Sequence, residues 1–174
     1  MKILGIDQGL ASCGFSIINI DEKDFEILEI GTIKTQSDEI LQYRLNYIYE
    51  ELDNLIKSNK DIQVIGVEKL HGKVMTVQLI TSIVFLLSFK YQIPVVELVP
   101  SSVKKEITGN GRASKKDIQE SLKETYMKSY KKRTNNHERD SVSIGITSYK
   151  KIQDKKSNYY KNYKEQIDKM EEGS

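Results

Sequence analysis

The sequence has one cysteine, no long uninterrupted apolar run and little net charge, and each shortage excludes a class of protein. A single thiol, Cys13, cannot form an internal disulfide, so we expect a buried structural cysteine and a reducing compartment. The most apolar stretch, residues 74–89, is too short to span a bilayer comfortably and is interrupted by hydroxyl and amide side chains. The few apolar residues after Met1 lead straight to an aspartate, which argues against a secretory signal.

Length and composition fit one globular domain with a proper core. The chain has 174 residues, of which 38% are hydrophobic and 30% charged, and it shows no internal repeat or linker. The net charge of +2 is unevenly spread, because residues 101–133 carry ten Lys/Arg against four Asp/Glu, whereas residues 1–100 carry nine against fourteen. A basic middle segment favours a surface that binds a polyanion. A solvated, lysine-rich helix explains the same pattern equally well.

The pattern of apolar residues predicts an α/β domain. Strands are expected at 2–7, 13–20, 25–35, 62–68 and 93–99, and helices at 37–58 (opening at Ser37), 74–90, from Ser101 or Ser102 to 108, from Ser114, and at 136–151. The short connections between the first three strands favour an antiparallel meander. We expect a mixed five-stranded sheet, three antiparallel strands followed by two parallel ones, flanked by helices. The domain covers residues 1–151, and residues 152–174 are expected to be a frayed helix or a disordered tail.

Two acidic residues end predicted strands. Asp7 ends the first strand and is followed by Gln8-Gly9, a turn signal more often than a catalytic site, which also occurs in actin- and sugar-kinase-type ATPases. Glu68 follows an apolar strand, where an unpaired buried carboxylate needs a partner or a metal ion. A strand-end glutamate that reaches solvent or pairs with Lys69 is an equally good interpretation. If the two strands are parallel neighbours, both carboxylates lie at one sheet edge, where ligand sites of α/β sheets occur.

A histidine and an aspartate open the last predicted helix. His137 and Asp140 are three residues apart, so both project from one face. The helix dipole alone explains an acid at this place, but it does not explain one of only two histidines. Asp7, Glu68, His137 and Asp140 together predict a mostly oxygen-lined pocket suited to Mg²⁺ or Mn²⁺. Such pockets cut phosphodiesters with two metal ions.

Basic residues surround a glycine-rich loop at 109–111, and these are candidates for contact with a phosphate backbone. His71 is expected at the rim of the pocket, where its ring either stacks on a nucleobase or is an ordinary surface side chain. The candidate DNA-binding residues are His71, Lys73, Lys104, Lys105, Arg112, Lys115 and Lys116.

Taken in order, four segments resemble the RuvC Holliday-junction resolvases of the RNase H-like nuclease superfamily. They are ILGIDQGLASCGFSII, VIGVEKLHGK, VELVPSSVKKEITGNGRASKKDI and NNHERDSVSIGITSYKK, and the resemblance covers about residues 2–150. Gln8 stands where most of that family has proline, and His71 where a base-stacking phenylalanine is familiar. The short, lysine-rich form looks more like the phage or low-GC Gram-positive branch.

The resemblance implies a metal-dependent endonuclease with an RNase H-like fold, acting in the cytoplasm of a bacterial cell and encoded by the cell or a phage. Two Mg²⁺ or Mn²⁺ ions would be held by Asp7, Glu68, His137 and Asp140, with Lys115, joined by Lys104, at the scissile phosphate. The products would carry 5′-phosphate and 3′-hydroxyl ends. Two symmetric nicks in a four-way junction imply a two-fold dimer, for which helix 74–90 is the candidate interface, through Val77, Ile80, Val84 and Leu87. Plain core packing of these residues is the alternative, and the helix can use one face for each. The resemblance does not extend to a branch-migration motor as partner.

Three other functions compete with junction resolution. A nuclease of the same fold can act on flaps, forks or RNA:DNA hybrids, as a general debranching enzyme. A non-catalytic branched-DNA binder is disfavoured by the intact set of acids and histidine. An actin-like ATPase is disfavoured because the sequence has no second strand ending in Asp-x-Gly and no room for a second subdomain.

Overall fold

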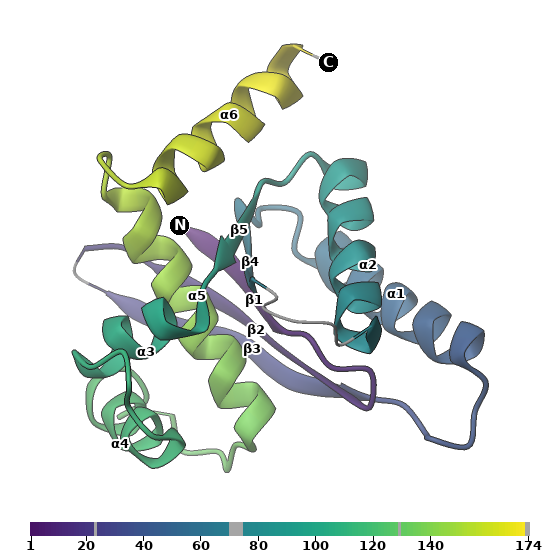
Figure 1. Cartoon of the computed structure of the whole chain (residues 1–174), viewed down its shortest axis with the longest axis horizontal. Helices are drawn as coiled ribbons and strands as arrows, with labels where there is room; N and C mark the ends of the chain where they lie inside the picture. Colours follow the sequence, from purple (N-terminus) through teal and green to yellow (C-terminus); the bar gives the residue numbers. More distant parts are fainter. Residues whose placement is uncertain (23, 70–74, 129, 173–174) are drawn as a thin grey trace.

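A single five-stranded sheet forms the centre of the molecule, with helices on both faces (Figure 1). The structure is a computed structural model that describes residues 1–22, 24–69, 75–128 and 130–172. The strands are β1 (Lys2–Asp7), β2 (Ser12–Ile20), β3 (Phe25–Lys34), β4 (Val64–Glu68) and β5 (Val95–Leu98). Their order is β3-β2-β1-β4-β5; β1, β2 and β3 are antiparallel neighbours, and β4 is parallel to both β1 and β5. The predicted mixed sheet is confirmed.

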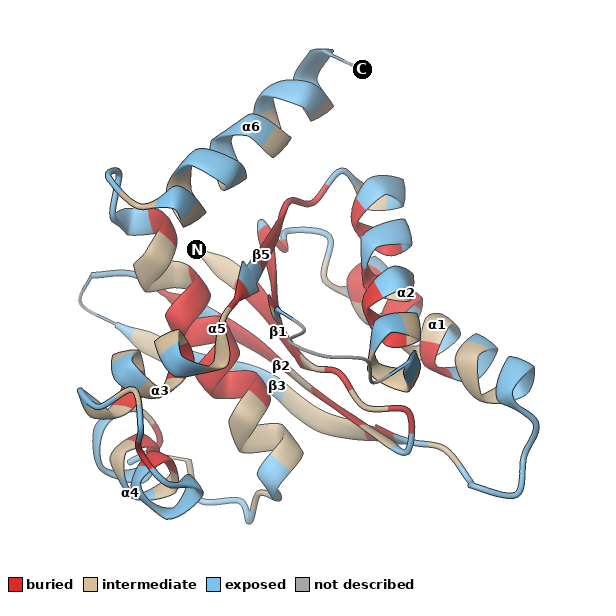
Figure 2. Ribbon diagram, in the orientation of Figure 1, coloured by how far each residue is buried: buried red, intermediate tan, exposed pale blue. Residues whose placement is uncertain are grey.

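Alternate residues of the central strands pack into two separate hydrophobic layers, because successive side chains of a strand point to opposite faces. Leu4 and Ile6 of β1 pack toward α1 (Leu41–Ser58) and α2 (Met75–Tyr91). On the other face, Ile3 of β1 joins the layer that contains α3 (Pro100–Thr108), α4 (Lys115–Thr125) and α5 (Asn136–Gln153). Figure 2 shows α5 as the most deeply buried helix, lying directly against the sheet. The sheet is therefore covered on both sides, as the unbroken apolar strand β4 predicted.

Helix starts differ in how well the sequence predicted them. Ser114 caps α4 and α5 begins at Asn136, both as expected. The prediction that Ser37 opens the first helix is wrong, since α1 begins at Leu41 with Ile40 in the N-cap position and no side-chain cap. A tertiary contact forms here instead, because Arg44 Nε of the first turn of α1 donates to Thr35 Oγ1, directly after β3, at 2.9 Å. Similarly, α3 begins at Pro100 rather than after a serine cap.

The apolar helix α2 has two different apolar faces. Ile80, Val84 and Leu87 are buried in the core, so they are not free to form the interface predicted for them. The large apolar side chains that α2 exposes are instead Met75, Phe85, Leu86 and Phe89, with exposures of 62%, 42%, 66% and 76% (Figure 2). No helix in the described part of the chain is both long enough and apolar enough to cross a membrane.

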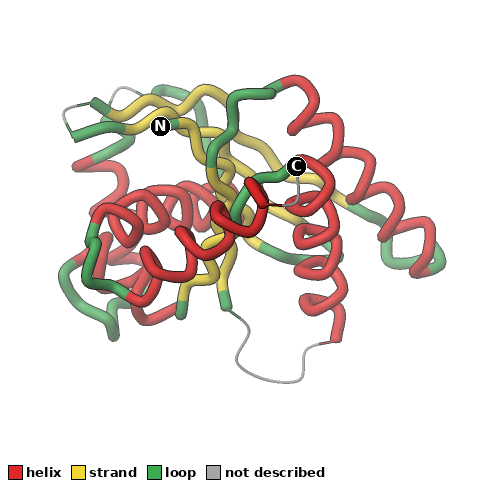
Figure 3. Tube along the Cα trace, turned by 90° about the horizontal axis from the view of Figure 1, so that it is seen from above, coloured by secondary structure: helices red, strands yellow, loops and turns green. Residues whose placement is uncertain are grey.

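Beyond the domain predicted for 1–151, residues Asn158–Glu172 form helix α6, which lies along the outer side of β5. Figure 1 shows α6 leaving the end of α5 and projecting from the body, and in the view from above (Figure 3) the C-terminus lies within the outline of the molecule. Tyr159 and Tyr163 pack against the layer that contains α3 and α5. Gln166 bonds the backbone of Val95 twice, accepting from its N–H at Oε1 and donating to its carbonyl from Nε2, both at 2.8 Å.

Candidate active site

The two strand-end carboxylates lie at the same edge of the sheet. β1 and β4 are parallel neighbours in which Ile6 faces Val67, so Asp7 and Glu68 leave the sheet side by side. This is the carboxyl edge, where ligand sites of α/β sheets form. The interpretation of Asp7 and Glu68 from the sequence required β1 and β4 to be parallel neighbours, and they are.

The first turn of α5 brings the remaining pair to this edge. Asn135 caps the helix in a reciprocal capping box with Glu138: Asn135 Oδ1 accepts from the Glu138 N–H at 3.0 Å, and Glu138 Oε2 accepts from the Asn135 N–H at 2.8 Å. Glu138 is thus occupied with the helix end, while His137 and Asp140 face the sheet. His137 Nδ1 lies 2.7 Å from Asp7 Oδ2.

Glycine allows α5 to approach the sheet this closely. A Cβ atom on Gly14 of β2 would overlap the His137 carbonyl, and one on Gly5 of β1 would overlap the Ser141 carbonyl. Backbone can touch backbone only where no side chain intervenes. These two glycines therefore set the distance between the first turns of α5 and the carboxylates of the sheet edge.

A pocket of about 300 Å³ opens between these elements. Its lining contains all four predicted metal-site residues together with two lysines, Lys104 of α3 and Lys115 of α4. The lining residues are Asp7, Glu68, Pro100, Val103, Lys104, Lys115, Ile118, His137, Asp140 and Ser143. Three oxygen-bearing acids, one imidazole and two ammonium groups therefore converge from four separate regions of the sequence.

The acids of the pocket lie close together, and the nearby lysines do not fully balance their negative charge. Burial, followed by the nearby charges of Asp7 and Asp140, raises the pKa of Glu68 to about 7 from its ordinary 4.5. Burial and the charge of Asp7 also raise the pKa of Asp140. Lys104 and Lys115 oppose the Glu68 shift without cancelling it. A cation bound among these acids would reduce their mutual repulsion.

The donor set suits a hard divalent ion, since carboxylate oxygens and an imidazole are ligands for Mg²⁺ and Mn²⁺. Within the described ranges, however, no three histidine, cysteine or carboxylate side chains already surround one point closely enough to ligate an ion. Instead, Asp7 Oδ2 contacts His137 Nδ1. The residues fit such an ion by chemistry and position, and binding it requires their side chains to rearrange.

Other predicted residues lie outside the pocket. Lys105, Arg112 and Lys116 are exposed on α3, the loop and α4, and none of them lines it. His71 and Lys73 fall outside the described residues. Sequence reasoning missed Gln8 and Ser143. Gln8 is 7% exposed and hydrogen-bonded to Glu68, while Ser143 lines the pocket and donates to the Arg139 carbonyl at 3.0 Å. The signal for Gln8 was its place directly after the strand-ending Asp7, and that for Ser143 was its place three residues after Asp140, on the same helix face.

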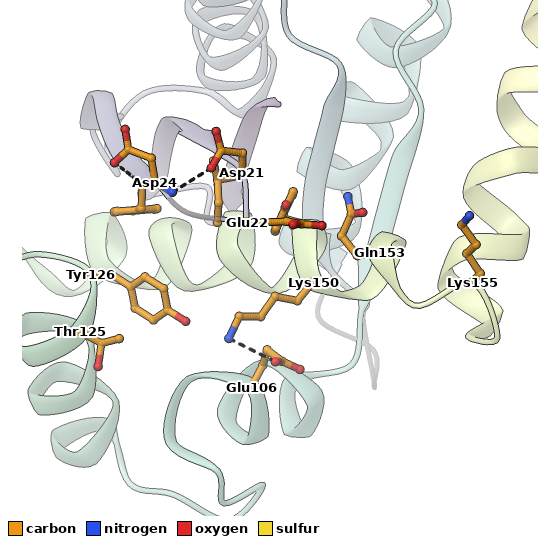
Figure 4. Close-up of a pocket in the computed structure, with 12 residues that line it drawn as sticks. Asp21, Glu22, Asp24, Glu106, Thr125, Tyr126, Lys150, Gln153 and Lys155 are labelled. Carbon is orange, nitrogen blue, oxygen red and sulfur yellow. Dashed lines mark hydrogen bonds and ion pairs between the residues drawn. The ribbon is translucent and has the colours of Figure 1, made fainter.

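A larger pocket, of about 840 Å³, contains none of the predicted residues (Figure 4). It lies beside the β2–β3 turn, between Asp21 and Asp24 on one side and Tyr126 and Lys150 on the other. Its charges are partly paired, since Lys150 Nζ lies 3.4 Å from Glu106 Oε1. Size alone therefore does not identify the site, and the chemistry favours the smaller pocket.

Comparison with known proteins identifies the family of the chain. A sequence model described as "Crossover junction endodeoxyribonuclease RuvC" matches residues 3–148, which include Asp7, Glu68, His137 and Asp140. The chain belongs to the RuvC family. The crossover junction endodeoxyribonuclease RuvC of Pseudothermotoga lettingae is 36% identical over 128 residues, covering 71% of this chain and 78% of that protein. The RuvC of Gloeobacter violaceus is 32% identical over 127 residues, covering 70% and 73%.

Solved RuvC structures share the fold. RuvC of Thermus thermophilus superposes with a TM-score of 0.77 at 20% identity, covering 86% of this chain and 93% of that one. The same protein in complex with a Holliday junction substrate gives a TM-score of 0.78 at 19% identity, covering 93% and 95%. The yeast mitochondrial Holliday junction resolvase Ydc2 gives 0.61 at 13% identity, covering 99% and 86%. The RNase H-like architecture implied by the sequence resemblance is confirmed.

Proposed function

We propose that this RuvC-family chain is a metal-dependent endonuclease that resolves Holliday junctions by paired symmetric nicks. The observation that carries the proposal is the convergence of Asp7, Glu68, His137 and Asp140 with Lys115 in one pocket of about 300 Å³. The Thermus thermophilus relative has been solved with a Holliday junction, which supports a four-way junction as the substrate. The products would carry 5′-phosphate and 3′-hydroxyl ends, and the enzyme would act in the bacterial cytoplasm.

Asp7, Glu68, His137 and Asp140 would hold Mg²⁺ or Mn²⁺, with two ions in each site. When bound, such ions supply a nucleophile at neutral pH and neutralise charge at the leaving oxygen. Burial and then the charges of neighbouring acids raise the pKa of Glu68 and of Asp140, and the relief of that repulsion by a cation supports this role. His137 keeps Asp7 oriented through Nδ1 until an ion replaces that bond.

The lysines of the pocket would neutralise the scissile phosphate. Lys115 stands in the first turn of α4 and Lys104 in α3, and both line the pocket together with the acids. The lysines would hold a phosphate placed between them and the acids, and the attack on that phosphate would take place beside the acids. Lys105, Arg112 and Lys116 would contact the phosphate backbone outside the pocket, and His71 and Lys73, which lie outside the described residues, stay candidates for DNA contact.

Paired nicks require two sites related by two-fold symmetry, and we propose that α2 forms the dimer interface. Its exposed apolar residues Met75, Phe85, Leu86 and Phe89 make a patch that a second copy would cover. Ile80, Val84 and Leu87, which were expected to take part, hold α2 to the core instead. One face of α2 thus packs against the core, and the other is proposed to pair with a second copy.

A cleavage assay with Mg²⁺ or Mn²⁺ tests the proposal. It compares a synthetic four-way junction, a three-way fork and a linear duplex, with Asp7→Asn as the inactive control. Paired symmetric nicks in the four-way junction alone are expected. Equal cutting of all branched forms would identify a general debranching nuclease instead. Tight junction binding without any cutting in either metal would indicate a non-catalytic binder.

A further inference from the structure

Gln8, the residue directly after β1, holds the backbone of Glu68. Its carboxamide is buried, with the residue 7% exposed, and makes two bonds to that one residue. Glu68 donates its N–H to Gln8 Oε1 at 3.1 Å, and Gln8 Nε2 donates to the Glu68 carbonyl at 2.9 Å. Both polar backbone groups of Glu68 on this side are therefore satisfied by one side chain.

The carboxamide continues the sheet beyond the end of a strand. Backbone pairing between β1 and β4 ends with Ile6 opposite Val67, and β1 itself ends at Asp7. Glu68 lies one residue further along, where β1 no longer offers a partner. Because a carboxamide has both N–H donors and a carbonyl acceptor, it can pair with a backbone as a peptide group does, and here it replaces the missing strand at the position that carries the carboxylate.

The same side chain connects Glu68 to α2. Gln8 Nε2 also lies 3.1 Å from Thr81 Oγ1, and Thr81 Oγ1 donates to the Val77 carbonyl at 3.0 Å. Thr81 is itself only 6% exposed. A buried chain of hydrogen bonds thus runs from the backbone of α2 through two side chains to the backbone of Glu68.

We propose that Gln8 is a positioning residue, which fixes Glu68 relative to Asp7 and couples the packing of α2 to the active site. The inference rests on the proposed function, because Glu68 matters only if its carboxylate takes part in cleavage. A side chain without a donor and an acceptor, such as leucine or proline, could not make these bonds, so this connection depends on the glutamine of this chain. The helix that would pair two protomers is therefore joined directly to one of the acids in each site.

Gln8→Leu tests the proposal, since leucine has a similar volume and no hydrogen-bonding group. We expect kcat on a four-way junction to fall by about 10-fold or more, because small displacements of catalytic groups are costly. The junction Kd, measured in EDTA, should stay within about twofold, because Gln8 does not face the DNA-binding lysines. The Mn²⁺ concentration that gives half of the metal-induced increase in Tm should rise, a readout that needs no cleavage.

Thr81→Val provides a second, milder variant that leaves both bonds to Glu68 in place. Its kcat should lie between those of wild type and Gln8→Leu, with an unchanged junction Kd. Wild-type kcat and Mn²⁺ response in both variants would overturn the inference, as would equal losses of kcat and junction affinity in Gln8→Leu. If the wild-type protein cut no junction, the proposed function would fail, while the Mn²⁺ response of the variants would still decide whether Gln8 positions Glu68.

Discussion

His137 and Asp7, which are 130 residues apart in the sequence, are joined by a contact of 2.7 Å between Nδ1 and Oδ2. The bond closes the site between the last strand residue of β1 and the first turn of α5. It also occupies an oxygen of Asp7 that the proposed metal ion would use. Binding of that ion, as proposed, would therefore replace this bond.

Asp7→Asn should reduce cleavage of a four-way junction by at least about 100-fold. Loss of a partner that merely orients a metal ligand already costs ~10–100-fold in metal sites, and Asp7 is placed as a ligand. The measurement is single-turnover cleavage at saturating enzyme with Mn²⁺. Asp61→Asn is the matched control, because Asp61 is an exposed aspartate that pairs with Lys2. An Asp7→Asn enzyme with nearly wild-type cleavage would remove Asp7 from the mechanism.

The raised pKa of Glu68 makes a prediction about stability. Since the folded state favours the protonated acid, its contribution is fully present below pH 4.5 and is lost as pH rises through about 7. Metal-free Glu68→Gln should therefore have a higher Tm than wild type at pH 8, by about 3 °C, and an equal Tm at pH 4. Glu29→Gln, at an exposed position on β3, should change neither. A lower Tm for Glu68→Gln at pH 8 would contradict the proposed repulsion.

Adding Mn²⁺ should reverse that order of stability. A ligand that binds only the folded state raises Tm with concentration, so the wild-type protein should gain stability at pH 8. Glu68→Gln should gain much less, because it lacks one of the charged oxygens. Differential scanning fluorimetry across an Mn²⁺ titration, followed by EDTA, measures both effects. Equal gains in the two proteins would place the ion elsewhere.

Lys115→Ala should reduce cleavage more than binding. Its ammonium group lines the pocket of the acids, so its charge acts on the phosphate being cut and only weakly on the rest of the DNA. We expect about a 10-fold or larger loss in single-turnover rate and a smaller change in junction Kd. Lys123→Ala, at an exposed position in the last turn of α4, is the control. Parallel losses of rate and affinity would make Lys115 a simple backbone contact.

Leu86→Glu and Phe89→Glu should convert a dimer into monomers. Both side chains are mostly exposed on α2, so charge there opposes association while leaving the core of the monomer intact. Light scattering after size exclusion measures the mass, and the junction assay should give single nicks in place of paired ones. Tyr43→Glu changes a side chain that is 70% exposed on α1 and should keep the dimer. Unaltered mass in the α2 variants would exclude this face.

The sequence was sufficient to predict the features that follow from local patterns. Asp7 and Glu68 each end an apolar strand, and His137 and Asp140 share one helix face, so their convergence followed once β1 and β4 were parallel neighbours. Ser114 was predicted as a cap because its interaction is made within a few residues.

Features that depend on distant contacts could not be predicted. The helix α2 is apolar on every side, so its sequence does not distinguish Leu87, which is buried, from Leu86, which is exposed. The first turn of α1 contacts Thr35 through Arg44 and is not capped by Ser37. The roles of Gln8 and Gln166 depend on which backbone groups the fold brings to them, and no periodicity reveals that.

The two hydrogen bonds between Gln166 and Val95 also affect whether other chains can pair with the edge of the sheet. β5 is the last strand of the sheet, and its outer peptide groups would otherwise offer a template to any extended chain. Gln166 occupies the N–H and the carbonyl of Val95, and α6 covers the strand around them. A chain shortened before residue 158 would keep the whole active-site pocket but open this border to strand addition, so its solubility would fall before its catalytic chemistry changed.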